Sequence, residues 1–372
     1  MLIKLTLLFL FLLNFNAYSH DFPQSQAIDG YDCKRASEIN LTDQCRKSRK
    51  WTEPYDGVLY DCHIHPNNTK NIDKYIEELK INKYELVVIA DTPNGYKKIL
   101  KGNEKHKKKL KKFSKMYNSK VLCGGHVLGF IEKGRFDLAR EYLNEAISDI
   151  EAGECEGFGE LGIQHFDKSC GNEELLSTVG RQSELILDKN NEIFLEMYDY
   201  ANKNNLLMDI HYEPARCQEN PKTNESVDYF KEVCRKYPNI KFSLAHTGMI
   251  TSQKIDELMM SCPNIYSSIK PIMKPSGWVN LEPPNNISNE FFEDWALLFE
   301  KYPDRFYLGS DWKENHRYYD ISLTEHTDNL RHLIGSLNKQ IQYNIAINSC
   351  KNLFNIKSVS YTHLTLPTSV LV

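Results

Sequence analysis

The sequence predicts an α/β protein that folds as a (β/α)8 barrel, also called a TIM barrel. Short runs rich in β-branched and aromatic residues alternate with longer segments whose apolar residues recur every three or four positions. Eight such runs follow one another over about 300 residues, which is the size and strand number of a barrel of parallel strands. Three helix-to-strand junctions also repeat one pattern, in which a proline ends the helix just before the strand begins.

The elements follow in order along the chain. The β-prone runs are GVLYDCHIH, YELVVIAD, KVLCGGH, CEGFGELG, NLLMDIHY, IKFSLAHTG, NIYSSIK and RFYLGSDW. The first segment between them carries the stripe Ile72, Ile76 and Leu79, which is typical of a helix with one buried face. A doubly wound open sheet is the alternative, but it would ordinarily carry a glycine-rich phosphate loop after its first strand, and HIHPNNTKN contains none.

The ends of the chain differ from its body. Residues 1–19 have the layout of a secretory signal peptide, with one lysine, an apolar stretch and a cleavage site after Ala-Tyr-Ser, so we expect an exported, periplasmic or secreted protein. Residues 20–56 form a polar N-terminal extension, and 57–357 form the barrel domain. Residues 358–372 contain no charged side chain and resemble a translated sequencing adapter, so we interpret them as a non-native tail.

Ten cysteines in an exported chain raise the question of disulfides. Short separations make two pairs candidates, Cys33 with Cys45 and Cys155 with Cys170. Cys62 and Cys123 lie inside apolar runs, where we expect buried free thiols. The sequence does not determine the connectivity.

The charge of the chain gives few indications about partners. The formal net charge of −4 does not point to nucleic acid. We expect a small-molecule substrate and no stable membrane span once the signal peptide is removed, and we leave open a homo-oligomer. The basic run KKILKGNEKHKKKLKKFSK is interpreted as the solvated face of a helix.

Polar residues stand at the C-terminal ends of the predicted strands, which is where barrels carry their active sites. They are His63, His65, Glu160, His211, His246 and Asp311. Residues i and i+2 of a strand share a face, so His63 and His65 project together. Imidazoles and carboxylates are ligands for one or two borderline divalent ions; Zn²⁺ matches best, with Mn²⁺, Fe²⁺ and Ni²⁺ as alternatives.

Five further residues near the strand ends are candidates for binding the substrate. Lys270 ends the seventh run and His126 ends the third, while Arg216, Trp278 and Arg317 lie in segments beyond strand ends. For each of them, an ordinary solvated loop residue is the competing interpretation. Several cationic candidates together favour a substrate that carries a carboxylate or a phosphate.

The motifs resemble those of the amidohydrolase superfamily, nearest the amidohydrolase-related (amidohydrolase 2) metal-dependent hydrolases. The matching stretches are HIH, GELG, DIH, LAHTG, LGSDW and the closing NSCKNLFNIK, and they span roughly residues 57–357. The resemblance implies that His63 and His65 bind one metal with Asp311, that His211 and His246 bind a second, and that Glu160 bridges them. It leaves open whether one or two ions bind.

The resemblance also implies a reaction. A divalent ion lowers the pKa of its bound water to about 7, and Asp311 would pass a proton from that water to the leaving group. We expect an exported metal-dependent hydrolase that cleaves an amide, ester or lactone bond in a small, anionic substrate. The alternatives are a non-oxidative decarboxylase of the same superfamily, against which Glu160 argues, and a barrel that binds metal or ligand without turnover.

Overall fold

The computed structural model describes residues 47–50, 53–66, 71–91, 105–166, 184–214, 223–271, 284, 290–313 and 321–356. The chain divides into two compact units, residues 1–47 and 48–372, and the described residues lie almost entirely in the second. The predicted signal peptide and the predicted non-native tail lie outside the described residues, so both stay predictions.

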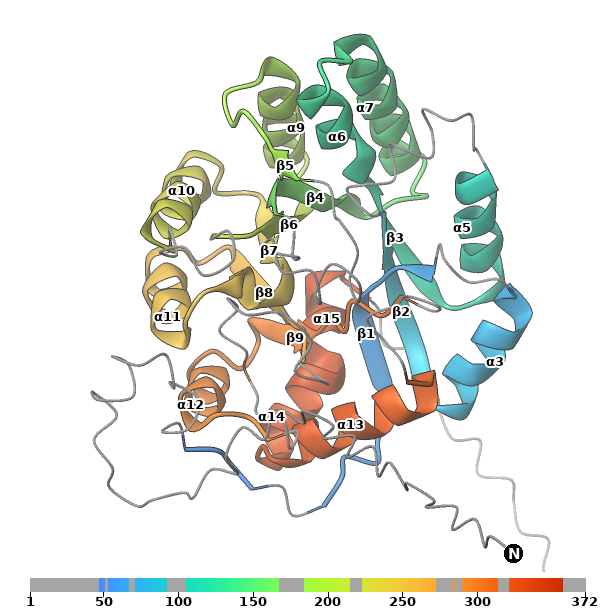
Figure 1. Ribbon diagram of the computed structural model, residues 1–372, viewed down its shortest axis with the longest axis vertical. Coiled ribbons are helices and arrows are strands. Elements are labelled where there is room, and N and C mark those ends of the chain that lie inside the picture. The colour runs from blue at the N-terminus through green and yellow to red at the C-terminus, as the bar shows by residue number, and fades with distance from the viewer. Residues whose placement is uncertain are drawn as a thin grey trace, which may run out of the picture. The chain divides into compact units, whose positions relative to one another are not determined.

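Eight parallel strands form one sheet in the order β1-β2-β3-β4-β6-β7-β8-β9 (Figure 1). They are β1 (Leu59–Ile64), β2 (Tyr84–Ala90), β3 (Ser119–Gly124), β4 (Gly157–His165), β6 (Leu207–Tyr212), β7 (Lys241–Leu244), β8 (Ile265–Ile269) and β9 (Phe306–Leu308). Ile64 pairs in parallel with Trp312, just beyond β9, so the sheet is nearly closed on itself. The predicted (β/α)8 barrel is confirmed. A two-residue strand, β5 (Leu185–Ile186), pairs antiparallel with β4 and was not predicted.

Helices stand between successive strands and around the sheet (Figure 1). They are α3 (Ile72–Ile81), α5 (Lys105–Met116), α6 (Gly125–Glu132), α7 (Phe136–Glu151), α9 (Glu192–Lys203), α10 (Thr223–Lys236), α11 (Ser252–Ser261), α12 (Glu293–Lys301), α13 (Leu323–Gly335), α14 (Lys339–Tyr343) and α15 (Ser349–Leu353). The predicted stripe Ile72, Ile76 and Leu79 is buried on α3. Among the helices of the described residues, none is both long and apolar enough to span a membrane.

Two apolar clusters hold the sheet and the helices together. The larger lies along the helices and one face of the strands, and it includes large side chains such as Phe194 and Trp295. The smaller joins Val88 and Leu122 of the sheet to Leu353 of α15. Lys241, at the start of β7, donates a hydrogen bond to the carbonyl oxygen of Leu353 at 3.0 Å. The end of α15 therefore lies by the N-terminal ends of the strands.

Three disulfides in the described residues correct the cysteine predictions. They join Cys62 to Cys350, Cys123 to Cys155 and Cys234 to Cys262. Cys62 and Cys123 are therefore not free thiols, because each meets a cysteine that the fold brings within about 6 Å between Cα atoms. Cys155 bonds to Cys123, so the predicted pair with Cys170 is wrong; Cys33 and Cys45 lie outside the described residues.

Candidate metal centre

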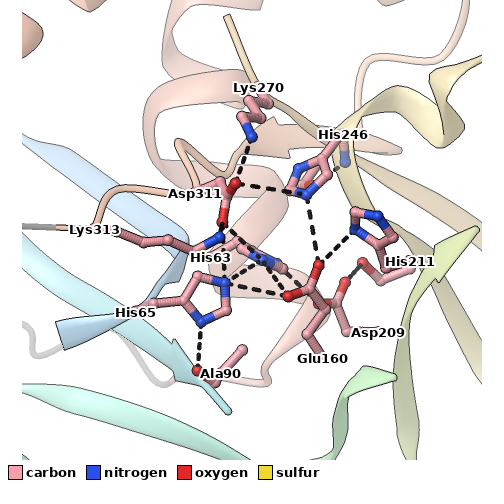
Figure 2. A network of polar contacts seen from close by, with 12 residues as sticks. His63, His65, Ala90, Glu160, Asp209, His211, His246, Lys270, Asp311 and Lys313 are labelled. Carbon is pink, nitrogen blue, oxygen red and sulfur yellow. Dashed lines mark hydrogen bonds and ion pairs between the residues drawn. The ribbon is translucent and has the colours of Figure 1, made fainter. Parts of the chain in front are cut away.

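All six predicted ligands lie close together at the C-terminal ends of the barrel strands (Figure 2). His63 and His65 come from the end of β1, Glu160 from β4 and His211 from β6. His246 lies in a 3₁₀ turn (Ala245–Met249) after β7, and Asp311 lies three residues after β9. Each of them keeps 6% or less of its accessible surface, so water cannot satisfy this polar cluster from outside.

Three of the imidazoles are held from outside the cluster by hydrogen-bond acceptors. Nδ1 of His65 donates to the carbonyl oxygen of Ala90 at 2.7 Å. Nδ1 of His63 lies 2.8 Å from a carboxylate oxygen of Asp209, and Nε2 of His211 lies 2.9 Å from one of Glu213. These partners place the ring proton on the outer nitrogen and leave the inner nitrogen of a neutral ring with a lone pair.

The inner atoms then face one another as acceptors. Nε2 of His63 and Nε2 of His65 are 3.2 Å apart, and Nε2 of His65 is 3.0 Å from Oδ1 of Asp311. Lone pairs at these separations repel one another unless a positive charge stands among them. A proton or a metal ion can supply that charge. The donor set of imidazoles and carboxylates fits a borderline divalent cation such as Zn²⁺.

Glu160 divides its two carboxylate oxygens between two pairs of histidines. Oε2 lies 3.3 Å from Nε2 of His65 and 3.8 Å from Nε2 of His63. Oε1 lies 2.8 Å from Nδ1 of His211 and 3.5 Å from Nε2 of His246. A carboxylate in this position can bind two cations at once, one on each side.

The charge state of the cluster also calls for a cation. Burial lowers the pKa of the His63 imidazole, but the carboxylates of Asp209, Glu160 and Asp311 raise it to about 9. Burial opposes ionisation of Glu160 as well, yet the surrounding imidazoles, His211 first, hold its pKa well below the usual range. Without a metal, the site is thus a set of carboxylates that takes up a proton on His63 to offset their charge.

Closure of the barrel brings β1 and the segment after β9 together at this site. The amide of Asp311 donates to the carbonyl oxygen of His63 at 2.9 Å, and the amide of His65 donates to that of Trp312 at 3.0 Å. Asp61 accepts hydrogen bonds from the amide and the hydroxyl of Ser310. Burial raises the pKa of Asp61 to about 6, and the Ser310 hydrogen bonds limit that rise.

Two of the six residues have an uncommon backbone conformation. His246 has φ of 58° and Asp311 has φ of 56°, in the left-handed region that side chains other than glycine rarely adopt. Both stand where a strand ends and the chain turns over the barrel. Positive φ at non-glycine residues is concentrated at functional sites, where the surrounding fold holds the strained backbone.

Two lysines hold Asp311. Lys270, just after β8, contacts Oδ2 of Asp311, and Nζ of Lys313 lies 2.8 Å from Oδ1. Burial would raise the pKa of Asp311, but the two ammonium groups hold it well below the usual range. Burial lowers the pKa of Lys270 to about 8. Lys270 was predicted to face the substrate, and it lies against the cluster.

Of the other four predicted substrate residues, the structure describes only His126. His126 lies in the first turn of α6, which begins directly after β3, and its Nε2 is 3.5 Å from a carboxylate oxygen of Asp91. His126 therefore lies beside the end of β2. Arg216, Trp278 and Arg317 lie outside the described residues.

Three functional candidates were missed in the sequence. Asp209 and Glu213 lie two residues before and after His211, so the alternation of β6 places all three on one side. That spacing could have identified them. Lys313 lies two residues after Asp311, where the strand has already ended, and its position has no comparable signal.

Comparisons with known proteins were made in sequence and in structure. Neither the family models nor the curated proteins give a match to this sequence. Solved structures match over most of the chain. An amidohydrolase from Burkholderia multivorans with bound zinc is 8% identical, with 81% of this chain and 100% of that chain covered and a TM-score of 0.44.

Two further matches are enzymes with other activities. A 5-carboxyvanillate decarboxylase from Novosphingobium aromaticivorans, complexed with manganese and 4-hydroxy-3-methoxy-5-nitrobenzoic acid, is 8% identical over 83% of this chain and 99% of that chain, with a TM-score of 0.46. A dihydroorotase from Saccharomyces cerevisiae in complex with 5-fluoroorotic acid is 10% identical over 81% and 85%, with a TM-score of 0.49. At these identities the function has to be argued from the site itself.

Proposed function

We propose that this chain is an exported, metal-dependent hydrolase of the amidohydrolase superfamily. It uses water to cleave a C–N or C–O bond, as in an amide, ester or lactone, in a small and anionic molecule. The carrying observation is the pair of inner nitrogens of His63 and His65, 3.2 Å apart, whose outer nitrogens face Asp209 and the carbonyl oxygen of Ala90. This arrangement supports the proposal that both histidines are metal ligands.

The proposed ligands form two overlapping sets. His63, His65 and Asp311 would hold one ion, and His211 and His246 would hold a second. Glu160 serves both, since each of its oxygens faces one pair of histidines. A bound divalent ion supplies Lewis acidity, which activates water and polarises the bond to be cleaved.

Asp311 is the proposed acid–base group. The two lysines keep it ionised, so it can accept a proton at a carboxylate oxygen from the attacking water. The same oxygen then returns the proton to the leaving nitrogen or oxygen. His246, whose pKa is lowered well below its ordinary value first by burial and next by Lys270, stays neutral and keeps its lone pair available as a ligand.

Export is part of the proposal. The signal-like residues 1–19 support it, and so do three disulfides, since disulfides persist in oxidising compartments such as the periplasm. The proposed partner is a small molecule. Nucleic acid is not expected as a substrate.

The first test is the metal content of the purified protein by elemental analysis, combined with an Asp311→Asn variant. We expect about two transition-metal ions per chain. The variant should keep much of its metal and lose turnover of a substrate found in a panel of amides, esters, lactones and aromatic acids. One ion per chain with release of carbon dioxide would favour the decarboxylase. No metal, even after addition of Zn²⁺ or Mn²⁺, would overturn the proposal.

A further inference from the structure

Asp311 is shared by two ammonium groups, one on each of its oxygens. Lys270 contacts Oδ2, and Lys313 lies 2.8 Å from Oδ1. Figure 2 shows the two lysine side chains reaching the carboxylate from different directions. A buried ammonium group needs a negative partner close by. In the metal-free protein, the single charge of Asp311 stands between both lysines.

Metal binding changes this balance. In the proposed function Asp311 is also a ligand, so its one negative charge would then be shared by two lysines and a divalent ion. Glu160, the other carboxylate of the six, is occupied by histidines on both of its oxygens. Metal binding therefore adds positive charge beside Lys270 and Lys313.

The two lysine side chains are more exposed than that of Asp311. The Lys313 side chain keeps 21% of its exposure and that of Lys270 keeps 10%, against 4% for Asp311. An anion arriving from solvent can thus meet the ammonium groups before it meets the carboxylate. Each ammonium group already contacts a carboxylate oxygen of Asp311, which is the kind of group that it would bind in a substrate.

We propose that Lys270 and Lys313 bind a carboxylate group of the substrate next to Asp311. This inference rests on the proposed function and adds the chemical class of its substrate. A small carboxylate adds negative charge beside the lysines and accepts a charge-assisted hydrogen bond from each of them. Its neighbouring bond then lies beside the metal ligands, where Asp311 can exchange a proton with it.

The experiment uses benzoate as the probe and benzamide as its uncharged counterpart, with binding to the Zn²⁺-loaded protein measured by calorimetry. We expect Lys270→Met and Lys313→Met each to weaken benzoate binding about tenfold or more, as for loss of a hydrogen bond between charged groups. Benzamide binding should not change. Lys241→Met, which removes a partly buried lysine at the opposite end of β7, is the matched control and should bind benzoate like the wild type.

Zinc content separates this inference from its alternatives. Removing a cation beside a metal site should leave Zn²⁺ binding unchanged or tighter, so we expect both variants to retain zinc. Loss of zinc in them would mean that the lysines only position Asp311, and it would overturn the inference, as would benzoate binding that does not depend on either lysine. If a methionine variant does not fold, Lys270→Arg and Lys313→Gln replace it in the same measurements. A wild-type protein that binds no Zn²⁺ would overturn the proposed function as well.

Discussion

Oδ2 of Asp209 lies 2.8 Å from Nδ1 of His63, although β6 and β1 are not neighbours in the sheet. The contact therefore crosses the interior of the barrel. Ser243 of β7 donates a hydrogen bond to the other carboxylate oxygen, and its hydroxyl also contacts that of Tyr307 on β9. Ser243 thus holds the Asp209 carboxylate in place, and Asp209 in turn orients the ring of His63, a proposed metal ligand.

Replacing Asp209 with asparagine should weaken metal binding. The amide keeps the size of the side chain and loses the charge that holds the proton on Nδ1 of His63. We expect Zn²⁺ affinity to fall about 10- to 100-fold, as for other carboxylates that support a histidine ligand, with the fold retained. Competition with a chromophoric chelator measures this, and Asp256→Asn on α11 is the control. Equal affinities in the two variants would contradict the role of Asp209.

Much of the fold could be predicted because its signals are local. A proline ends the helix at Pro238 and at Pro303, and a strand follows each time. The ligands at these ends follow from topology, since parallel strands of a barrel present their C-terminal ends together. The shared direction of His63 and His65 could be predicted from the alternation of side chains along β1 alone.

The missed features depend on contacts between distant parts of the chain. Cys62 and Cys350 are 288 positions apart, and only closure of the barrel against α15 brings them together. Asp209 shares a side of β6 with His211, but its partner lies across the barrel on β1. Lys313 lies two residues after Asp311, whose φ is positive, and there the alternation of a strand no longer indicates direction.

The disulfide between Cys62 and Cys350 should support both stability and metal binding, because Cys62 directly precedes His63. Replacing both cysteines with alanine should lower the free energy of unfolding by about 2–4 kcal/mol, as measured by denaturant titration. It should also weaken Zn²⁺ binding. The matched control replaces Cys234 and Cys262, which join α10 to the end of α11. This control should lose stability and keep its metal affinity. Equal zinc affinity in both double variants would contradict the coupling.

Gly309 lets the end of β9 approach β1. A Cβ atom there would stand 2.9 Å from Cβ of His63 and 2.6 Å from Cβ of Ser268, closer than real side chains come. Gly309→Ala should cost about 1–3 kcal/mol of stability, like other overpacked sites, and should displace His63 enough to weaken Zn²⁺ binding. The control is Gly157→Ala at the start of β4, where the added Cβ atom would crowd the carbonyl oxygen of Leu207. The control should lower the melting temperature without changing zinc affinity. A larger loss of zinc affinity in Gly157→Ala than in Gly309→Ala would contradict this account.

His326 should contribute to loss of stability in acid. It is buried on α13 with its ring centroid 4.7 Å from that of Trp312, and burial lowers its pKa to about 3. The unfolded imidazole takes up a proton below about pH 6.5, while the folded one resists until about pH 3. Its stabilising effect is therefore complete above pH 6.5 and is lost progressively as the pH falls towards 3.

Denaturant titrations of the wild type and of His326→Gln at several pH values test whether His326 causes this loss of stability. Over the same interval the wild type should lose more unfolding free energy than the variant, on the order of 1 kcal/mol per pH unit. His332→Gln, on the same helix and only partly buried, is the control and should follow the wild-type curve. Parallel curves for the wild type and His326→Gln would mean that the acid sensitivity arises elsewhere, with the buried carboxylates of the metal centre as the next groups to examine.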